Sequence, residues 1–134
     1  MIHLDTTFLV DAMRESRRRS VGPAHRWLAQ HRQESLALSV FVLGELLVGA
    51  ELHAEADQER QCVLSICGEL PIISPDRRLA ERYASTHAHL SRRGTPLATM
   101  DLLIGCTALV EDAAVLTANT SHFSRIPGLR VLEY

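Results

Sequence analysis

The sequence predicts an α/β fold in which helices cover a mainly parallel sheet of four or five strands. Short apolar runs recur along the 134 residues, and segments with helical spacing of apolar side chains separate them. Ser, Thr, Gly or Pro stand at many of the junctions. Runs of three or four residues are too short for helices, and strands joined through helices pair in parallel.

The first eleven residues contain the first strand–helix junction. Ile2 to Leu4 is expected to be a strand, Asp5 ends it, and apolar residues continue at helical spacing from Phe8 onward. Asp5 therefore lies where a strand gives way to a helix, and open α/β sheets bind ligands at that edge. Asp is also a preferred N-cap, so a purely structural role for Asp5 stays open.

The next part of the chain repeats this pattern. After a polar loop at 14–20, Gly22-Pro23 opens a second helix, because proline is tolerated in a first helical turn. The second strand is expected at Leu36 to Leu38. Ser39 then caps a third helix over about 40–53.

Glu45 is the most anomalous side chain of that third helix. Its helical neighbours are apolar or glycine, and no Lys or Arg stands three or four residues away. A carboxylate in such surroundings loses hydration unless a cationic group meets it. Glu45 is therefore a candidate functional residue, with an exposed helix edge as the alternative.

The second half of the chain continues the alternation. We expect an apolar helical stripe at 62–70, a strand at 71–73, and a helix that starts at Ser74-Pro75 and runs to Arg93, with Gly94 as its stop. A nearly all-apolar helix should follow from Met100 to about Glu111, with strands at 115–117 and 129–132. Asp101 is the one early charge of the apolar helix, where the helix dipole also favours an acid. Thr99 is expected to cap that helix, and Asn119 follows the fourth strand by two residues.

Composition narrows the classes of function. The content of 46% hydrophobic and 22% charged residues is typical of a globular protein, and we expect one domain over 1–134. No apolar run approaches the length of a membrane span. The start lacks a secretory signal and the cysteines form no CxxC pair, so we expect a cytoplasmic protein with reduced cysteines. A net charge of −2 argues against a protein that coats nucleic acid, but not against an enzyme that cuts it.

All fourteen basic residues are Arg, and the chain contains no Lys. Two clusters stand out, and they are Arg17, Arg18 and Arg19, and Arg92 and Arg93. Each cluster is either a solvated face or a binding site for RNA phosphates, which the guanidinium fork suits well.

Three acids and one amide are predicted to share one edge of the sheet: Asp5, Glu45, Asp101 and Asn119. Strand ends and the starts of the following helices lie at the same edge of a parallel sheet with right-handed crossovers. Asp101 follows a loop, so its placement is the less direct inference.

Crowded carboxylates repel one another unless a cation joins them, and oxygen ligands select Mg²⁺ or Mn²⁺. Zinc is disfavoured because no HExxH or paired-Cys motif is present, and phosphodiester hydrolysis is the reaction that such a site serves best.

Four short motifs follow one another in the order of a known family. They are Leu4 to Asp11, Leu38-Ser39 through Glu45-Leu46, Gly94 to Leu97 with Asp101 to Ile104, and Leu116 to Asn119 with Phe123. In these motifs the chain resembles the PIN-domain ribonucleases, and among them the VapC-type toxins of bacterial toxin–antitoxin pairs. The resemblance implies a PIN-like fold, metal-dependent RNA cleavage with Mg²⁺ or Mn²⁺, and Asp5, Glu45 and Asp101 as the acidic core.

The resemblance also implies supporting residues and partners. Asn119 matches a fourth catalytic position where many members carry Asp, so a second metal ion would be held more weakly. Thr6 and Thr117 match hydroxyl positions beside the acids. His122 stands where relatives often have an acid, and we assign it no role. The implied partners are an RNA substrate, a small VapB-type antitoxin whose tail enters the acidic site, and a second copy of the chain.

Two other functions compete with this interpretation. A Mg²⁺-dependent phosphatase-like or receiver domain also begins with a strand that ends in Asp. The haloacid-dehalogenase pattern needs a second Asp where Thr7 stands, and both of these classes use a Lys that this chain lacks. A catalytically weak PIN-fold binding module is the other alternative. Asn119 is a partial loss of the acidic set, but the three principal acids are present and favour the enzyme.

Overall fold

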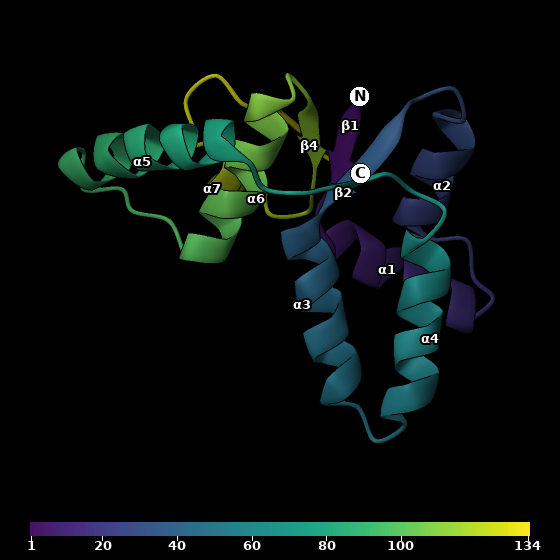
Figure 1. The fold of residues 1–134 in the computed structure, drawn as a ribbon. Coiled ribbons are helices and arrows are strands. Elements are labelled where there is room, and N and C mark those ends of the chain that lie inside the picture. Colours follow the sequence, from purple (N-terminus) through teal and green to yellow (C-terminus); the bar gives the residue numbers. More distant parts are fainter.

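The computed structural model describes all 134 residues, which form five strands and seven helices (Figure 1). In chain order the elements are β1 (Ile2–Leu4), α1 (Thr6–Arg17), α2 (Pro23–Gln30), β2 (Leu36–Ser39), α3 (Val40–Glu51), α4 (Ala56–Cys67), β3 (Ile72–Ile73), α5 (Arg77–Arg92), α6 (Thr99–Val110), β4 (Ala114–Leu116), α7 (Thr120–Phe123) and β5 (Arg130–Leu132). The five strands form one sheet, as expected, and every neighbouring pair is parallel.

β1 is the central strand of the sheet, whose order is β3-β2-β1-β4-β5. Ile2 pairs with Leu36 of β2 on one side and with Ala114 of β4 on the other. The chain first builds outward from β1 to β2 and β3, and then returns to add β4 and β5 on the opposite edge. The topological switch therefore lies beside β1, and a crevice for a ligand forms outside the carboxyl ends of strands at such a point.

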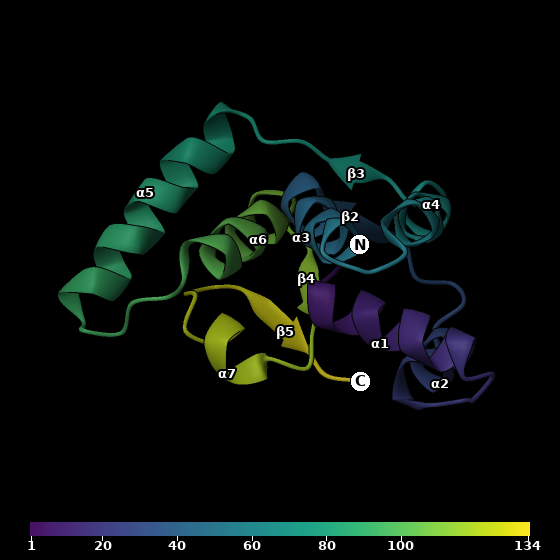
Figure 2. The same ribbon diagram turned by 90° about the horizontal axis from the view of Figure 1, so that it is seen from below.

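Helices cover the sheet on both sides. In Figure 2, α1 and α2 lie on one side of the strands, and α5 and α6 lie on the other. α3 and α4 run side by side and extend away from the sheet (Figure 1). α6 is buried along most of its length, as its apolar sequence predicts. None of the helices has the length and apolar character needed to cross a membrane.

An aromatic cluster closes the core beside α1. Phe8 is 1% exposed and meets the rings of Trp27 and Tyr134 edge-on, with centroids 5.8 and 4.8 Å away. The hydroxyl of Tyr134 donates to Asp11 of α1 at 2.8 Å. These contacts fix the last residue of the chain against the helix that follows Asp5.

The first helix is longer than the sequence analysis predicted. α1 continues to Arg17, whereas a polar loop was expected from Arg14. The reason is Glu15, which is buried and accepts hydrogen bonds from the backbone N–H groups of Ala24 and His25 at 3.1 and 2.9 Å. Burial acts to raise the pKa of Glu15, but the hydrogen bonds from His25 and Ala24 together hold that pKa below its usual value. An acid in a polar segment thus anchors the start of α2.

Several other boundaries were also predicted wrongly. α4 begins at Ala56, before the apolar helical stripe expected at 62–70, and the segment after Asn119, for which the sequence predicted no helix, forms the short helix α7. α5 begins at Arg77 because the carboxylate of Asp76, not Ser74-Pro75, accepts a hydrogen bond from the N–H of Leu79 at 3.1 Å. Thr99 is the first residue of α6, after Ala98 at the N-cap, and makes no capping bond.

Candidate active site

Asp5 lies directly after β1 at the carboxyl edge of the sheet and is 4% exposed. Its Oδ2 atom accepts hydrogen bonds from the hydroxyls of Thr7, at 2.8 Å, and Thr117, at 2.7 Å. Asp5 occupies the N-cap position of α1, but no N–H of the helix donates to its side chain. The purely capping role left open above is therefore wrong.

The two hydroxyls that hold Asp5 are themselves fixed by the backbone after β4. Thr117 is fully buried and accepts from the N–H of Asn119 at 2.8 Å. Thr7 accepts from the N–H of Ala118 at 3.1 Å. Residues more than one hundred positions apart thus form one network, in which Asp5 has a defined orientation. Sequence analysis placed Thr117 beside the acids but assigned Thr7 no role at the site.

Glu45 lies on α3, which follows β2, and it is half-buried. Its Oε2 atom accepts a hydrogen bond from the hydroxyl of Thr6. No Arg or His forms an ion pair with Glu45, so this hydroxyl is the polar partner that its apolar surroundings lacked in the sequence. The adjacent residues Thr6 and Thr7 therefore hold Glu45 and Asp5, respectively.

Asp101 lies in the first turn of α6 and contacts a histidine that sequence analysis left without a role. Its Oδ2 atom is 2.9 Å from Nδ1 of His122, and the side-chain amide of Asn119 is 2.8 Å from the same ring nitrogen. Asn119 and His122 are three residues apart at the helical turn α7, which brings them to one face. That spacing is the signal that could have linked them.

The four predicted residues thus come from the ends of three neighbouring strands or from the helices beside them. The structure contains no group of three His, Cys, Asp or Glu side chains that is arranged to hold a metal ion. The donor chemistry nevertheless fits Mg²⁺. Each of the three carboxylates has one oxygen in a hydrogen bond and one that makes none. Mg²⁺ keeps several water ligands and is usually bound through one or two carboxylates, so a full protein cage is not required.

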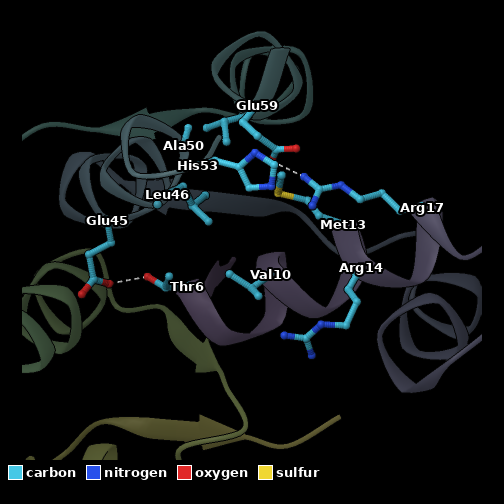
Figure 3. A pocket seen from close by; sticks show the side chains of 12 residues that line it. Thr6, Val10, Met13, Arg14, Arg17, Glu45, Leu46, Ala50, His53 and Glu59 are labelled. Atoms are coloured by element: carbon cyan, nitrogen blue, oxygen red, sulfur yellow. Dashed lines mark hydrogen bonds and ion pairs between the residues drawn. The ribbon is translucent and has the colours of Figure 1, made fainter. Parts of the chain in front are cut away.

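A groove leads away from Glu45 between α1, α3 and α4. It has a volume of about 260 Å³, with Thr6 and Glu45 at one end and the Arg17–Glu59 ion pair at the other (Figure 3). Apolar side chains line the middle of the groove, and they are Val10, Met13, Leu46, Ala50 and Val63.

The two arginine clusters lie far from each other. Arg17, Arg18 and Arg19 stand at the end of α1, and Arg92 and Arg93 at the end of α5, which occupies the opposite side of the molecule (Figure 2). Neither cluster contacts Asp5 or Asp101, and only Arg17 reaches the groove that begins at Glu45.

Comparison with known proteins gives one consistent family. A PIN-domain profile matches residues 2–129. Ribonuclease VapC19 of Mycobacterium tuberculosis is 36% identical over 132 residues, which is 95% of either chain. The tRNA(fMet)-specific endonuclease VapC of Salmonella typhimurium is 29% identical over 99 residues, covering 74% of this chain and 75% of the relative.

The fold gives the same answer. The structure of VapBC2 from Rickettsia felis, bound to a fragment of promoter DNA, superimposes with a TM-score of 0.87 at 28% identity and covers 100% of this chain and 99% of that one. The chain belongs to the PIN-domain family, and within it to the VapC-type proteins.

Proposed function

We propose that this protein is an endoribonuclease that acts as the toxin of a toxin–antitoxin pair and hydrolyses RNA phosphodiester bonds. The observation that carries the proposal is that a VapC-type chain has Asp5 directly after β1, Glu45 on the helix that follows β2, and Asp101 in the first turn of α6. The relatives at 36% and 29% identity are named as a ribonuclease and a tRNA endonuclease. We assign RNA as the substrate class.

The three acids would hold the metal ion, Mg²⁺ or Mn²⁺, through their free oxygens. When bound, the ion would act as a Lewis acid and lower the pKa of a water molecule, so that hydroxide is available as the nucleophile at neutral pH. The task of the protein is to orient the acids beforehand. Thr7 and Thr117 fix Asp5, and Thr6 fixes Glu45, so little side-chain reorganisation accompanies binding.

An antitoxin is the second partner that we propose. Solved VapBC structures resemble this chain over nearly its whole length. The groove beside Glu45 suits a helical or extended peptide, because its middle is apolar and its end near Glu45 is acidic. An Arg of the partner's tail would pair with Glu45 or Asp5 in the place of the metal ion. Phosphate binding by the arginine clusters, homodimerisation and a cytoplasmic location remain predictions.

Cleavage of RNA by the purified protein tests the proposal. We expect cleavage with Mg²⁺ or Mn²⁺, none in EDTA, and a rise in melting temperature on metal addition, because the ion binds the folded state only. In cells, expression should arrest growth, and Asp5→Ala or co-expression of the neighbouring small reading frame should relieve the arrest. If folded, metal-replete protein binds RNA but never cleaves it, the binding-module alternative is correct.

A further inference from the structure

The start of α1 lacks the side-chain cap that α3 and α5 have. Ser39 accepts a hydrogen bond from an N–H of α3, and Asp76 accepts one from an N–H of α5. Asp5 stands at the same position before α1, but its carboxylate bonds the hydroxyls of Thr7 and Thr117 instead. An N-cap side chain satisfies one of the first N–H groups of a helix. Without that bond, the first turn of α1 depends on support from elsewhere in the fold.

This uncapped turn carries the two threonines that hold acids of the candidate site. Thr6 and Thr7 are the first two residues of α1, and their hydroxyls donate to Glu45 and Asp5, respectively. Thr7 also accepts a hydrogen bond from the N–H of Ala118, after β4. Fraying of the turn would release both hydroxyls at once. The orientation of the two carboxylates therefore depends on what holds the start of α1 in place.

Tyr134, which follows β5, makes two contacts with this part of α1. Its hydroxyl donates to the Oδ2 atom of Asp11 at 2.8 Å, and its ring meets that of Phe8 edge-on, with the centroids 4.8 Å apart. Phe8 and Asp11 stand one and four residues after Thr7, so both contacts lie within about one helical turn of Thr7. Arg14 pairs with the other oxygen of Asp11 at 2.7 Å, which leaves Oδ2 to Tyr134.

The surroundings of the Tyr134 hydroxyl link it to the same network. Burial raises the pKa of Tyr134 above its usual range, and the hydrogen bond to Asp11 raises it further. Hydrogen bonding with Thr7 lowers that pKa, and the charge of Asp5 raises it. The hydroxyl therefore lies close enough to Thr7 and Asp5 to sense both, and it stays protonated as a donor at neutral pH.

We propose that Tyr134 is a positioning residue of the metal site. It holds the uncapped start of α1 and so keeps the hydroxyls of Thr6 and Thr7 against the two acids. Tyr134 acts through the helix and not through contact with the ion or the RNA. This proposal rests on the metal site of the proposed function and adds a residue that maintains its geometry.

Two variants remove the same hydrogen bond from its two ends. Tyr134→Phe keeps the edge-on ring and removes the donor, whereas Asp11→Leu removes the acceptor and keeps the tyrosine. The exposed ion pair that Asp11→Leu also loses contributes little. The double variant should therefore behave like either single variant. Tyr83→Phe is the matched control, because Tyr83 is the only other tyrosine of the chain and its ring lies beside His87 on α5.

Amide hydrogen exchange of the metal-free full chain tests whether Tyr134 holds the turn. The N–H of Leu9 donates to the carbonyl of Asp5 in the first turn of α1, and the N–H of Ala118 donates to Thr7. Both amides should exchange about threefold faster or more in Tyr134→Phe and in Asp11→Leu, because loss of one hydrogen bond eases local opening. They should exchange at the parent rate in Tyr83→Phe. Unchanged exchange in Tyr134→Phe would overturn the proposal.

Calorimetric titration with Mg²⁺ and Mn²⁺ tests the consequence for the site. Metal affinity should fall by about three- to tenfold in both single variants and by no more in the double variant, and it should stay at the parent value in Tyr83→Phe. Faster exchange with unchanged metal affinity would show that Tyr134 supports the fold alone, and additive losses would show that Tyr134 and Asp11 act separately. Either result would overturn the positioning role. Because no RNA is present, the outcome is independent of cleavage: a protein that cuts RNA, but binds metal equally well without the Tyr134 hydroxyl, leaves the proposed function standing.

Discussion

The candidate site has two halves that hold their acids in different ways. In the half at the ends of β1 and β4, which we call the strand half, Asp5 is 4% exposed and receives two hydroxyl hydrogen bonds. In the half formed by α6 and α7, the helix half, the side chain of Asp101 is 22% exposed and its partner His122 is 43% exposed.

This difference indicates a fixed half and an adjustable half. Hydrogen bonds in a buried, low-dielectric network are stronger and leave few alternatives to their members. A half-exposed pair joined through one ring nitrogen competes with water and can rearrange at lower cost. We expect the strand half to define where a ligand binds and the helix half to adjust to it.

Replacing either acid singly by Asn gives the largest expected effect. Asp5→Asn and Asp101→Asn should each reduce RNA cleavage by more than the roughly 100-fold that loss of an outer-shell partner costs. Their stabilities should differ. Asp5→Asn exchanges charge-assisted hydrogen bonds for neutral ones and should lower the free energy of unfolding by about 1–2 kcal/mol. Asp101→Asn should leave the metal-free protein at least as stable as the parent.

Cleavage assays and thermal melts of the two variants, both without metal, measure this contrast. The hydrogen bond found for the Asp101 side chain is the one with His122, so marked destabilisation by Asp101→Asn would show that Asp101 has a structural role in α6. Equal stability losses in both variants would remove the distinction between the halves.

The free energy of unfolding also depends on pH through His3 of β1, the strand that precedes Asp5. His3 is 1% exposed, and neither ring nitrogen has a hydrogen-bond partner. Burial lowers its pKa to about 4, with a smaller opposing effect from Glu111. Because the fold disfavours the charged ring, stability is complete above the unfolded pKa near 6.5 and falls as the pH drops towards 4. Over this pH range, protonation of His3 should lower the free energy of unfolding by about 3 kcal/mol.

Chemical denaturation of the parent protein and of His3→Leu between pH 4 and 7 measures this effect. The free energy of unfolding of the parent should fall progressively as the pH drops over that range. The free energy of unfolding of His3→Leu should fall by about 3 kcal/mol less. Parallel curves for the two proteins would mean that His3 is paired or hydrated in solution.

Much of the strand half could be predicted from the sequence. Asp5 stands at a change from a three-residue apolar run to helical periodicity, and both signals are local. Glu45 stood out because its helical neighbours offer it no partner. The hydroxyl network that holds these acids was out of reach, because the bond from Thr117 to Asp5 joins positions 112 residues apart.

The helix half and the end of α1 show why the rest could not be predicted. The contact of His122 with Asp101 depends on how α7 packs against α6, and a lone histidine in a polar segment carries no sign of it. Glu15 was assigned to a loop because its neighbours are polar. Its burial follows from the N–H groups of residues nine and ten positions later, which only the folded chain brings together.

Thr117→Val tests the rigidity of the strand half. The substitution removes one donor to Asp5 and the acceptor of the Asn119 N–H. We expect a loss of about 10- to 100-fold in metal affinity and cleavage. The free energy of unfolding should fall by about 1–3 kcal/mol, because a buried group loses its partner.

Thr107→Val is the matched control for this change. Thr107 is also buried, but its hydroxyl donates only to Leu103 of its own helix, at 2.8 Å. Metal affinity should stay at the parent value in this variant. A similar loss of affinity in both variants would mean that general destabilisation, and not the support of Asp5, weakens the site.

The smallest effect is expected from Asn119→Asp in the helix half. A carboxylate in place of the amide adds negative charge beside Asp101, within reach of the ring that the amide now contacts at 2.8 Å. Without metal the added repulsion should lower the melting temperature slightly, whereas metal affinity should rise several-fold, because a divalent ion relieves the repulsion. Calorimetry with Mg²⁺ measures the gain in metal affinity, and thermal melts with and without metal measure the opposite shifts in melting temperature.

The gain in metal affinity should be modest, because solvent screens the half-exposed helix half and the new carboxylate can turn away from the site. Unchanged affinity would remove Asn119 from the metal site and leave it as a partner of His122 alone.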